Sequence, residues 1–269
     1  MTIAVIGDAM IDLYVNGSFG RVSPEWGMPI FTGGAGVLLP GGAANVAWEM
    51  VKHNQQVELT CLNDLSAVEV FERHGITCNT VGEPIKLPVK TRFFHDGIPV
   101  MMRWDVETKP EPQNFAFTST ATVCILCDYN KGFFSDSFGL PSDCITIADS
   151  KVGRFVGATV YKLNAKEAAH QTGTSDLKEA SRIIRDRSQA KYVVITNGDQ
   201  GFHLFDGHVH GRTNPNAFET VCVKNIVGAG DAFTAHLAIG LASGNDIETA
   251  CKQANVKARD YVTQPRGVE

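Results

Sequence analysis

Residues 159–196 read TVYKLNAKEAAHQTGTSDLKEASRIIRDRSQAKYVVIT. Each end of this stretch, Thr159 to Leu163 and Tyr192 to Thr196, is a short apolar run of the kind that forms a buried strand. Between them, Ala165 to Gln171 and Asp176 to Ser188 have the length and residue types of helices. Strands that alternate with helices in this way predict a mostly parallel sheet with helices on both faces.

The same rhythm extends over most of the 269 residues. Further candidate strands are Ile3 to Ile6, Thr122 to Cys127 and Cys144 to Ala148, and further candidate helices are Ala43 to His53, Ala229 to Ala242 and Ile247 to Val262. We therefore expect an α/β fold in three layers, with the sheet in the middle. No linker or internal repeat divides the chain, so we expect a single domain over residues 1–269.

Two patches do not follow this rhythm. Met10 to Phe31 and Pro88 to Asp105 consist of short alternating stretches, the first of them broken by turn residues such as Asn16-Gly17. Such stretches are typical of hairpins with one face in water. We predict that they form a small β-sheet lid, made from about residues 10–36 and 86–106, which stands off the main sheet.

The composition argues against several functions. A formal net charge of -5 does not suit a nucleic-acid or anionic-membrane surface. There is neither an apolar run of about 18 residues nor a signal peptide, so we expect a cytoplasmic protein. The seven cysteines, of which only Cys124 and Cys127 have C-x-x-C spacing, are expected to be small buried thiols. His203, His208 and His210 are expected at the surface, because no histidine pair has the spacing of a zinc motif.

The most informative motif is Gly228-Ala229-Gly230-Asp231, at the start of a candidate helix. Small residues there allow free backbone N–H groups to approach an anion, and the helix dipole adds attraction. An aspartate beside these amides can take the proton from an attacking hydroxyl while the amides stabilise a transferring phosphoryl group. An ordinary first-turn aspartate, favoured only by the dipole, fits the same four residues.

Three further motifs have both a functional and a purely structural interpretation. Gly41-Gly42-Ala43-Ala44-Asn45 leads into a helix, and Asn45 offers a donor and an acceptor to sugar hydroxyls. Asn164 and Glu167 form an N-x-x-E pair, which fits either a capping box or a face that meets phosphates and Mg²⁺. Thr196 to Gly201 is a glycine-containing loop that suits a nucleotide or a plain hairpin turn.

In this order the motifs resemble the PfkB (ribokinase-like) family of carbohydrate kinases over nearly the whole chain. The resemblance implies a ribokinase-like fold, the use of ATP and Mg²⁺, and transfer of the γ-phosphate to an alcohol group. Within the family, the sequence is most similar to kinase domains for D-glycero-D-manno-heptose 7-phosphate, which act on its anomeric hydroxyl in bacterial lipopolysaccharide-precursor synthesis. The similar stretches are Gly7 to Asp12, Arg21 to Glu25, Lys90 to Arg92, Arg103 to Asp105 and Cys127 to Gly132.

The resemblance also implies roles for individual residues. At the helix start that begins with Gly228, Asp231 would be the base, and the amides of Ala229, Gly230 and Asp231 would form the anion hole. The sugar would be held by Asp12, Gly41, Gly42 and Asn45, and its phosphate by Arg92, Arg103 and Lys131. The ATP site would be lined by Asn164, Thr196, Gly198, Gly201 and Asn255, with Glu167 on Mg²⁺.

The chain departs from the family pattern just before this helix start, where Asn225-Ile226-Val227 replaces Asp-x-Thr or Asp-x-Ser. The family often uses that aspartate near a monovalent-cation site, so dependence on such a cation stays open. Two other functions also stay open: a kinase for another sugar or a nucleoside, and a non-catalytic relative that binds sugar or nucleotide. The exposed lid strands predict a homodimer through lid-to-lid packing, since an open sheet edge tends to be covered.

Overall fold

The computed structural model describes residues 2–96, 98–113, 120–207, 210–211 and 221–266. Its main sheet has nine strands: β1 (Thr2–Gly7), β5 (Gln56–Leu62), β6 (Thr77–Val81), β9 (Val123–Asp128), β10 (Ile145–Ser150), β11 (Val160–Asn164), β12 (Tyr192–Thr196), β13 (Phe202–Phe205) and β14 (His210–Gly211). They lie in the order β14-β13-β12-β11-β10-β9-β1-β5-β6. Neighbours from β12 through to β6 are parallel, whereas β13 and β14 are antiparallel.

Helices cover both faces of this sheet. They are α1 (Ala43–Lys52), α2 (Leu65–Arg73), α3 (Ala165–Thr172), α4 (Leu177–Ser188), α5 (Ala229–Ala242) and α6 (Ile247–Val262). On β13, the ring of Phe202 lies 6.0 Å from that of Phe233 on α5, while His203 Nε2 lies 3.3 Å from Ser181 Oγ on α4. Because successive side chains of a strand point to opposite faces, α4 and α5 lie on opposite sides of the sheet. The predicted three-layer α/β fold is confirmed.

All six residues of β9 are buried, as its apolar sequence predicts, since both faces of the strand are covered. At other positions, burial differs from the sequence-based expectation. The prediction that His203 lies at the surface is wrong, because α4 covers it, and His208 lies outside the described residues. All seven cysteines are free, but Cys222 is exposed, and Cys78 and Cys144 are only half-buried. Among the described residues, no helix is long and apolar enough to cross a membrane.

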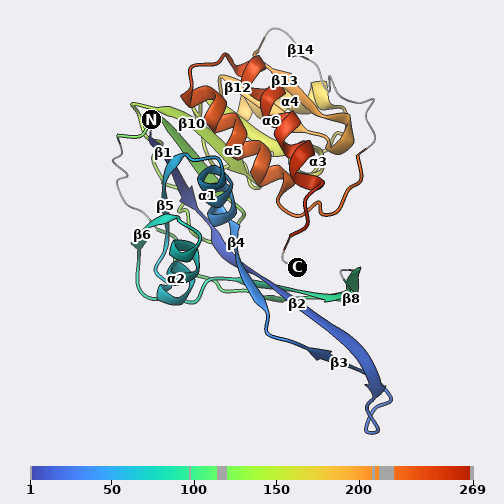
Figure 1. Cartoon of the computed structure of the whole chain (residues 1–269). Coiled ribbons are helices and arrows are strands. Elements are labelled where there is room, and N and C mark those ends of the chain that lie inside the picture. Colours follow the sequence, from blue (N-terminus) through green and yellow to red (C-terminus); the bar gives the residue numbers. More distant parts are fainter. Residues whose placement is uncertain (1, 97, 114–119, 208–209, 212–220, 267–269) are drawn as a thin grey trace.

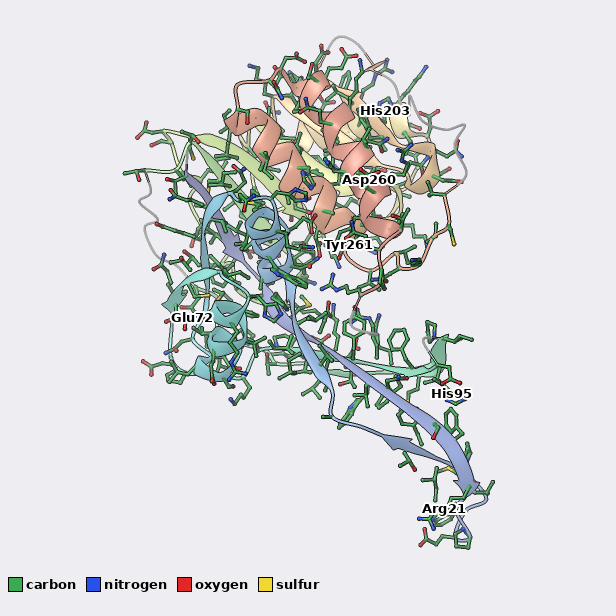
Figure 2. The ribbon with its side chains drawn as sticks, viewed as in Figure 1. Arg21, Glu72, His95, His203, Asp260 and Tyr261 are labelled. Carbon is green, nitrogen blue, oxygen red and sulfur yellow. The ribbon has the colours of Figure 1, made fainter. Side chains whose placement is uncertain are left out.

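A small sheet extends away from the main body (Figure 1). Its strands are β2 (Ala9–Val22), β3 (Pro29–Gly33), β4 (Val37–Gly42), β7 (Val89–His95) and β8 (Ile98–Val106). β2 is central: it pairs in parallel with β7 and antiparallel with β3 and β4, and β7 pairs with β8. Figure 2 shows Arg21 and His95 on this sheet, far from His203 in the main body.

The predicted break at Asn16-Gly17 is wrong, because β2 continues through both residues. Asn16 pairs with Phe94 of β7, and Gly17 pairs with Gly33 of β3. The glycine serves a close approach instead of a turn, since a Cβ on Gly17 would lie 2.5 Å from the ring of Phe31. The long strand connects the two sheets, and β4 runs directly from the small sheet into α1.

Candidate active site

The carboxylate of Asp231 lies in the first turn of α5 and has two side-chain hydrogen bonds. Asn45 Nδ2 donates to Oδ2 at 2.6 Å, and the Tyr129 hydroxyl donates to Oδ1 at 2.8 Å. Burial raises the pKa of Asp231, and the bonds from Asn45 and Tyr129 oppose that rise. The carboxylate is therefore held in one orientation by residues from α1 and from the loop after β9.

The backbone at the start of α5 is open to an anion. No side chain caps the helix, and Gly228 at the N-cap has a φ of 89°. The amide of Ala229, which was predicted to line the anion hole, donates to the carbonyl of Ile226 at 3.3 Å. Among the described residues, the amides of Gly230 and Asp231 have no acceptor. These two amides, at the positive end of the helix dipole, are suited to an anion.

Gly228 is also required by its neighbours. A Cβ at this position would lie 2.5 Å from Arg266 Nη1, 2.5 Å from the Tyr261 hydroxyl and 2.7 Å from Asn45 Nδ2. Any side chain would displace polar groups on three different segments. The glycine therefore allows these groups to approach the helix start.

The predicted sugar-binding residues lie together where β2 and β4 meet α1. Gly41 and Gly42 pair with Met10 and Ala9 of β2, and a Cβ on Gly41 would lie 3.1 Å from the carboxyl carbon of Asp12. Asn45 is buried, and its Oδ1 has no hydrogen-bond partner among the described residues. A buried acceptor without a donor is costly, so this atom is suited to a ligand hydroxyl.

Asp12 itself is paired with two arginines. Arg92 Nη1 lies 2.7 Å from Oδ1, and Arg266 Nη2 lies 3.1 Å from Oδ2. Arg266 also donates to the carbonyls of Pro40 and Val227, at 2.8 and 3.4 Å. Sequence reasoning missed Arg266, because no motif marks it. Tyr129, also missed, lies within the Cys127 to Gly132 stretch that carried the family resemblance.

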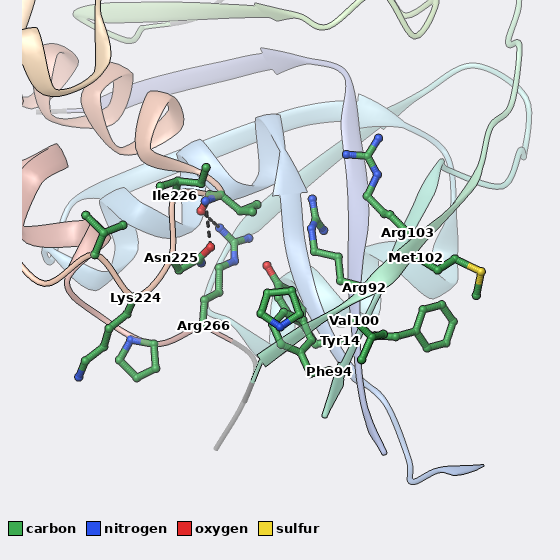
Figure 3. Close-up of a pocket in the computed structure, with 15 residues that line it drawn as sticks. Tyr14, Arg92, Phe94, Val100, Met102, Arg103, Lys224, Asn225, Ile226 and Arg266 are labelled. Atoms are coloured by element: carbon green, nitrogen blue, oxygen red, sulfur yellow. Dashed lines mark hydrogen bonds between the residues drawn. The ribbon is translucent and has the colours of Figure 1, made fainter. Parts of the chain in front are cut away.

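A cavity of about 800 Å³ lies between the small sheet and the segment before α5 (Figure 3). Among the described residues, it is lined by four basic side chains, Arg92, Arg103, Lys224 and Arg266, and by no acidic one. Its lining also contains three buried atoms that can donate and have no partner among the described residues: the Tyr14 hydroxyl, Asn225 Nδ2 and Arg266 Nε. Positive charge and unpaired donors together suit an anionic ligand.

Lys131 does not line this cavity with Arg92 and Arg103, although the three were predicted to meet the same phosphate. Its Nζ lies 2.6 Å from Glu107. It belongs instead to a second basic group with Lys90 and Lys151, because the pKa of Lys90 is lowered by burial first and then by these two lysines. Lys151 Nζ stands 5.1 Å from the ring centre of Tyr129, beside Asp231.

The residues predicted to bind ATP lie at the carboxyl edge of the main sheet. Asn164 and Thr196 are direct neighbours on β11 and β12. The loop after β12 contains Gly198 and Gly201, both with positive φ, and the Asn197 amide closes it by donating to Gly201 O at 2.7 Å. Asn255 lies on α6, half-buried. Two residues before Asn164, the buried Lys162 connects this edge to α5, with Nζ 2.9 Å from Asp149 and 3.3 Å from Gly230 O.

Asn164 and Glu167 form a complete capping box at the start of α3. Asn164 Oδ1 accepts from the Glu167 amide, and Glu167 Oε2 accepts from the Asn164 amide, both at 2.9 Å. This is the structural alternative that the spacing left open. It occupies one carboxylate oxygen of Glu167, so a contact with Mg²⁺ stays a proposal.

The family model described as pfkB family carbohydrate kinase matches residues 122–267. The chain belongs to the pfkB family of carbohydrate kinases. It is thus a phosphotransferase with an alcohol group as acceptor.

Relatives of this pfkB-family kinase include the bifunctional protein HldE of Azorhizobium caulinodans, 31% identical over 95% of this chain and 60% of that protein. The bifunctional protein HldE of Helicobacter hepaticus is 29% identical over 95% of this chain and 59% of that protein. The chain therefore spans about three fifths of the length of these relatives.

Two solved structures show the fold. Phosphofructokinase-2 from Escherichia coli superposes with a TM-score of 0.76 at 15% identity, covering 99% of this chain and 94% of that one. Ribokinase from Thermotoga maritima gives a TM-score of 0.72 at 17% identity, with the same coverage of 99% and 94%. The ribokinase-like fold predicted from the motifs is confirmed.

Proposed function

We propose that this sugar kinase transfers the γ-phosphate of ATP to the anomeric hydroxyl of a heptose 7-phosphate. The observation that carries the proposal is the basic cavity beside the Asp231 site. The cavity extends to Val227, the residue before the helix cap, and its lining residues carry buried donors that lack acceptors among the described residues. A sugar that bears its own phosphate would satisfy these donors while its hydroxyl reaches the carboxylate. The resemblance to heptose 7-phosphate kinase domains points to the same substrate.

In the proposed reaction, Asp231 takes the proton of the sugar hydroxyl while the hydroxyl oxygen forms a bond to the γ-phosphorus. The bond from that phosphorus to the bridging oxygen breaks, and ADP leaves. The amides of Gly230 and Asp231 stabilise the negative charge on the phosphoryl oxygens. Asn45 holds Asp231 through Nδ2 and offers Oδ1 to a sugar hydroxyl. We place this reaction in the cytoplasm, where ATP is available.

We propose that ATP lies along the carboxyl edge of the main sheet, over Asn164, Thr196, Gly198 and Gly201. Mg²⁺, when bound with ATP, would neutralise phosphate charge, and Glu167 is the side chain proposed to face it. Glu167→Gln separates the two roles of this residue, since glutamine also completes a capping box. We expect the variant to keep its stability but to need a higher Mg²⁺ concentration for half-maximal rate. Equal Mg²⁺ dependence would assign Glu167 to the cap alone.

Asn225 bears on whether this kinase depends on a monovalent cation. The solved phosphofructokinase-2 structure is a complex with potassium, but Asn225 stands where the family often has an aspartate near such a site. Here Asn225 Oδ1 accepts from the Val227 amide at 2.9 Å, so this oxygen is already engaged. We propose that activity does not require K⁺. Comparing rates in potassium and in tetramethylammonium salts tests this directly.

The substrate proposal is tested by ADP release with paired sugars, a heptose and its 7-phosphate. We expect a clear preference for the phosphorylated sugar. Arg103 is the variant of choice, because it lines the cavity and, among the described residues, pairs only with Asp105. Arg103→Gln is expected to raise KM for the sugar phosphate about 10-fold, the effect of losing one charge-assisted phosphate contact, and to leave the unphosphorylated sugar unaffected. A kinase indifferent to the 7-phosphate would instead be a kinase for another sugar.

We also propose that two copies pair through their small sheets. Of the fifteen large apolar side chains that are exposed among the described residues, ten lie on the small sheet or its turns: Phe19, Val22, Trp26, Met28, Val37, Leu38, Ile98, Met102, Trp104 and Val106. An apolar surface concentrated on one open sheet favours association. Trp104, 60% exposed on β8, is the best probe. Light scattering should find a dimer that Trp104→Glu converts to monomers, whereas a monomeric parent would contradict the proposal.

A further inference from the structure

Outside the proposed active site, three potential metal ligands converge between α1 and α5. Glu49 and His53 lie one helical turn apart at the end of α1, and His236 lies on α5. Their ligand atoms are all within 4.8 Å of one another. Glu49 Oε1 lies 3.3 Å from His53 Nε2 and 3.4 Å from His236 Nε2. Two imidazoles therefore point at a single carboxylate oxygen.

These separations fit a zinc coordination sphere. Zinc binds histidine nitrogen and carboxylate oxygen at about 2.0–2.1 Å, so ligand atoms at two corners of a tetrahedron lie about 3.3–3.4 Å apart. The same separations exceed the usual N–H···O range of about 2.7–3.2 Å. His236 is only 7% exposed, and its Nε2 has no hydrogen-bond partner among the described residues. A buried ring nitrogen that points at a carboxylate without a good hydrogen bond suits an ion between them.

Two lysines oppose a cation here. Lys52 Nζ forms an ion pair with Glu49 Oε2, and Lys257 lies near His53. However, Lys52 also stands 4.6 Å from the ring centre of Trp48 and 5.2 Å from that of Tyr261. Its ammonium would keep these aromatic contacts when a metal takes the carboxylate.

We propose that Glu49, His53 and His236 form a binding site for a divalent transition metal, with Zn²⁺ the best fit. The His53 side chain is 40% exposed, so an ion can reach this ligand from solvent. The metal would bridge α1 and α5, whose first turns hold Asn45 and Asp231 in hydrogen-bond contact. Its role is structural, so the proposal does not depend on the identity of the sugar.

The test is calorimetric titration of the metal-stripped full chain with Zn²⁺, followed by Co²⁺ absorption. We expect one ion per chain and a Co²⁺ spectrum without the thiolate charge-transfer band. His53→Ala and His236→Ala should each weaken binding at least 10-fold, the scale of losing a group that tunes or supplies a metal ligand. His170→Ala, which removes an exposed histidine on α3, is the matched control and should bind as the parent does.

Two further measurements separate a metal site from a network of ion pairs. Lys52→Gln should tighten Zn²⁺ binding, because it removes the competing ammonium from Glu49. Zn²⁺ at about 100 times its Kd should raise the parent Tm by roughly 5 °C, but not that of His53→Ala. His53 is exposed, so this variant decides the question even if His236→Ala fails to fold. Absence of binding in the parent, or equal affinity in His53→Ala, would overturn the proposal.

Discussion

Helices α3 and α5 begin near the same buried lysine, Lys162. The backbone amides of their first turns differ in the hydrogen bonds that they make. At α3, Asn164 and Glu167 close the helix with two reciprocal hydrogen bonds. At α5, the cap is Gly228, no side chain accepts from the first turn, and the Asp231 carboxylate is held by Asn45 and Tyr129 instead. One helix start is complete by itself, whereas the other leaves two amides for an anion.

This difference shows where the fold gives up stability for function. Capping a helix start is worth about 1 kcal/mol, and α5 forgoes it at a position where the neighbouring polar groups converge. Both starts carry an acidic residue in the first turn, so the dipole argument alone does not distinguish them. The two helix starts differ in what the carboxylate binds. Glu167 accepts from the backbone at the start of its own helix, whereas Asp231 accepts from side chains on other segments.

The sharpest test of this contrast is Asp231→Asn. The amide side chain keeps the shape but cannot take a proton, so kcat should fall about 10²-fold or more. A coupled ADP-release assay at saturating substrate measures it, with circular dichroism to check folding. If the variant matched the parent rate, Asp231 would not be the catalytic base, and the contrast between the two helix starts would have no functional meaning.

Gly228→Ala tests whether the open helix start needs its glycine. The added Cβ would meet Arg266 and Asn45 within 2.7 Å, at a φ of 89°. We expect an unfolding free energy lower by about 1–3 kcal/mol, the usual cost of such strain, and a kcat lower by roughly 10-fold because Asn45 shifts.

Gly173→Ala is the matched control for that variant. Gly173 has a φ of 79° at the end of α3 and no atom within 4 Å of an added Cβ. Because its backbone has a similar positive φ, this variant should lose about 1 kcal/mol of unfolding free energy. Its kcat should not fall. Equal losses of kcat in both variants would show that the contacts around Gly228 have no specific role.

Tyr129→Phe tests the second bond to Asp231 through the pH profile. Burial raises the pKa of Asp231, and the Tyr129 bond lowers it, so removing the hydroxyl should raise that pKa further. A base works only when deprotonated, so the acidic limb of kcat/KM should move to higher pH, with a modest loss of rate at neutral pH. As a control, Tyr192→Phe should leave the pH profile unchanged, because Tyr192 lies at the start of β12 and Thr196, at the proposed ATP site, lies at its end. A shift to lower pH would contradict the assignment.

The smallest effect is expected at the closed helix start. Asn164→Ala and Asp176→Ala each remove an N-cap, of α3 and α4, and should each cost about 1 kcal/mol of stability. That corresponds to a Tm lower by roughly 2–4 °C. If Asn164 also meets ATP, only Asn164→Ala should raise KM for ATP, and equal KM values would leave it a cap alone.

Local patterns were sufficient to predict most of the fold. Apolar runs and helix periodicity located β1 and β9 to β12 with the helices α1, α3, α4, α5 and α6, because burial on both faces leaves a continuous signal. They did not mark β5, β6 or α2. The prediction failed where long-range pairing decides: Asn16-Gly17 lies inside β2 because neighbouring strands supply ladder partners. His203, in the same way, is buried because α4 packs over it.

By itself, the sequence determined the α/β class, the kinase family and the helix start at Gly228 to Asp231, since each depends on residues close together in the chain. Only the tertiary structure decided which atoms face these residues. Arg266 reaches Asp12 across 254 positions, and His236 faces Glu49 from another helix. No spacing rule covers such pairs, because the packing of helices and sheets, and not the local backbone, sets the distance between them.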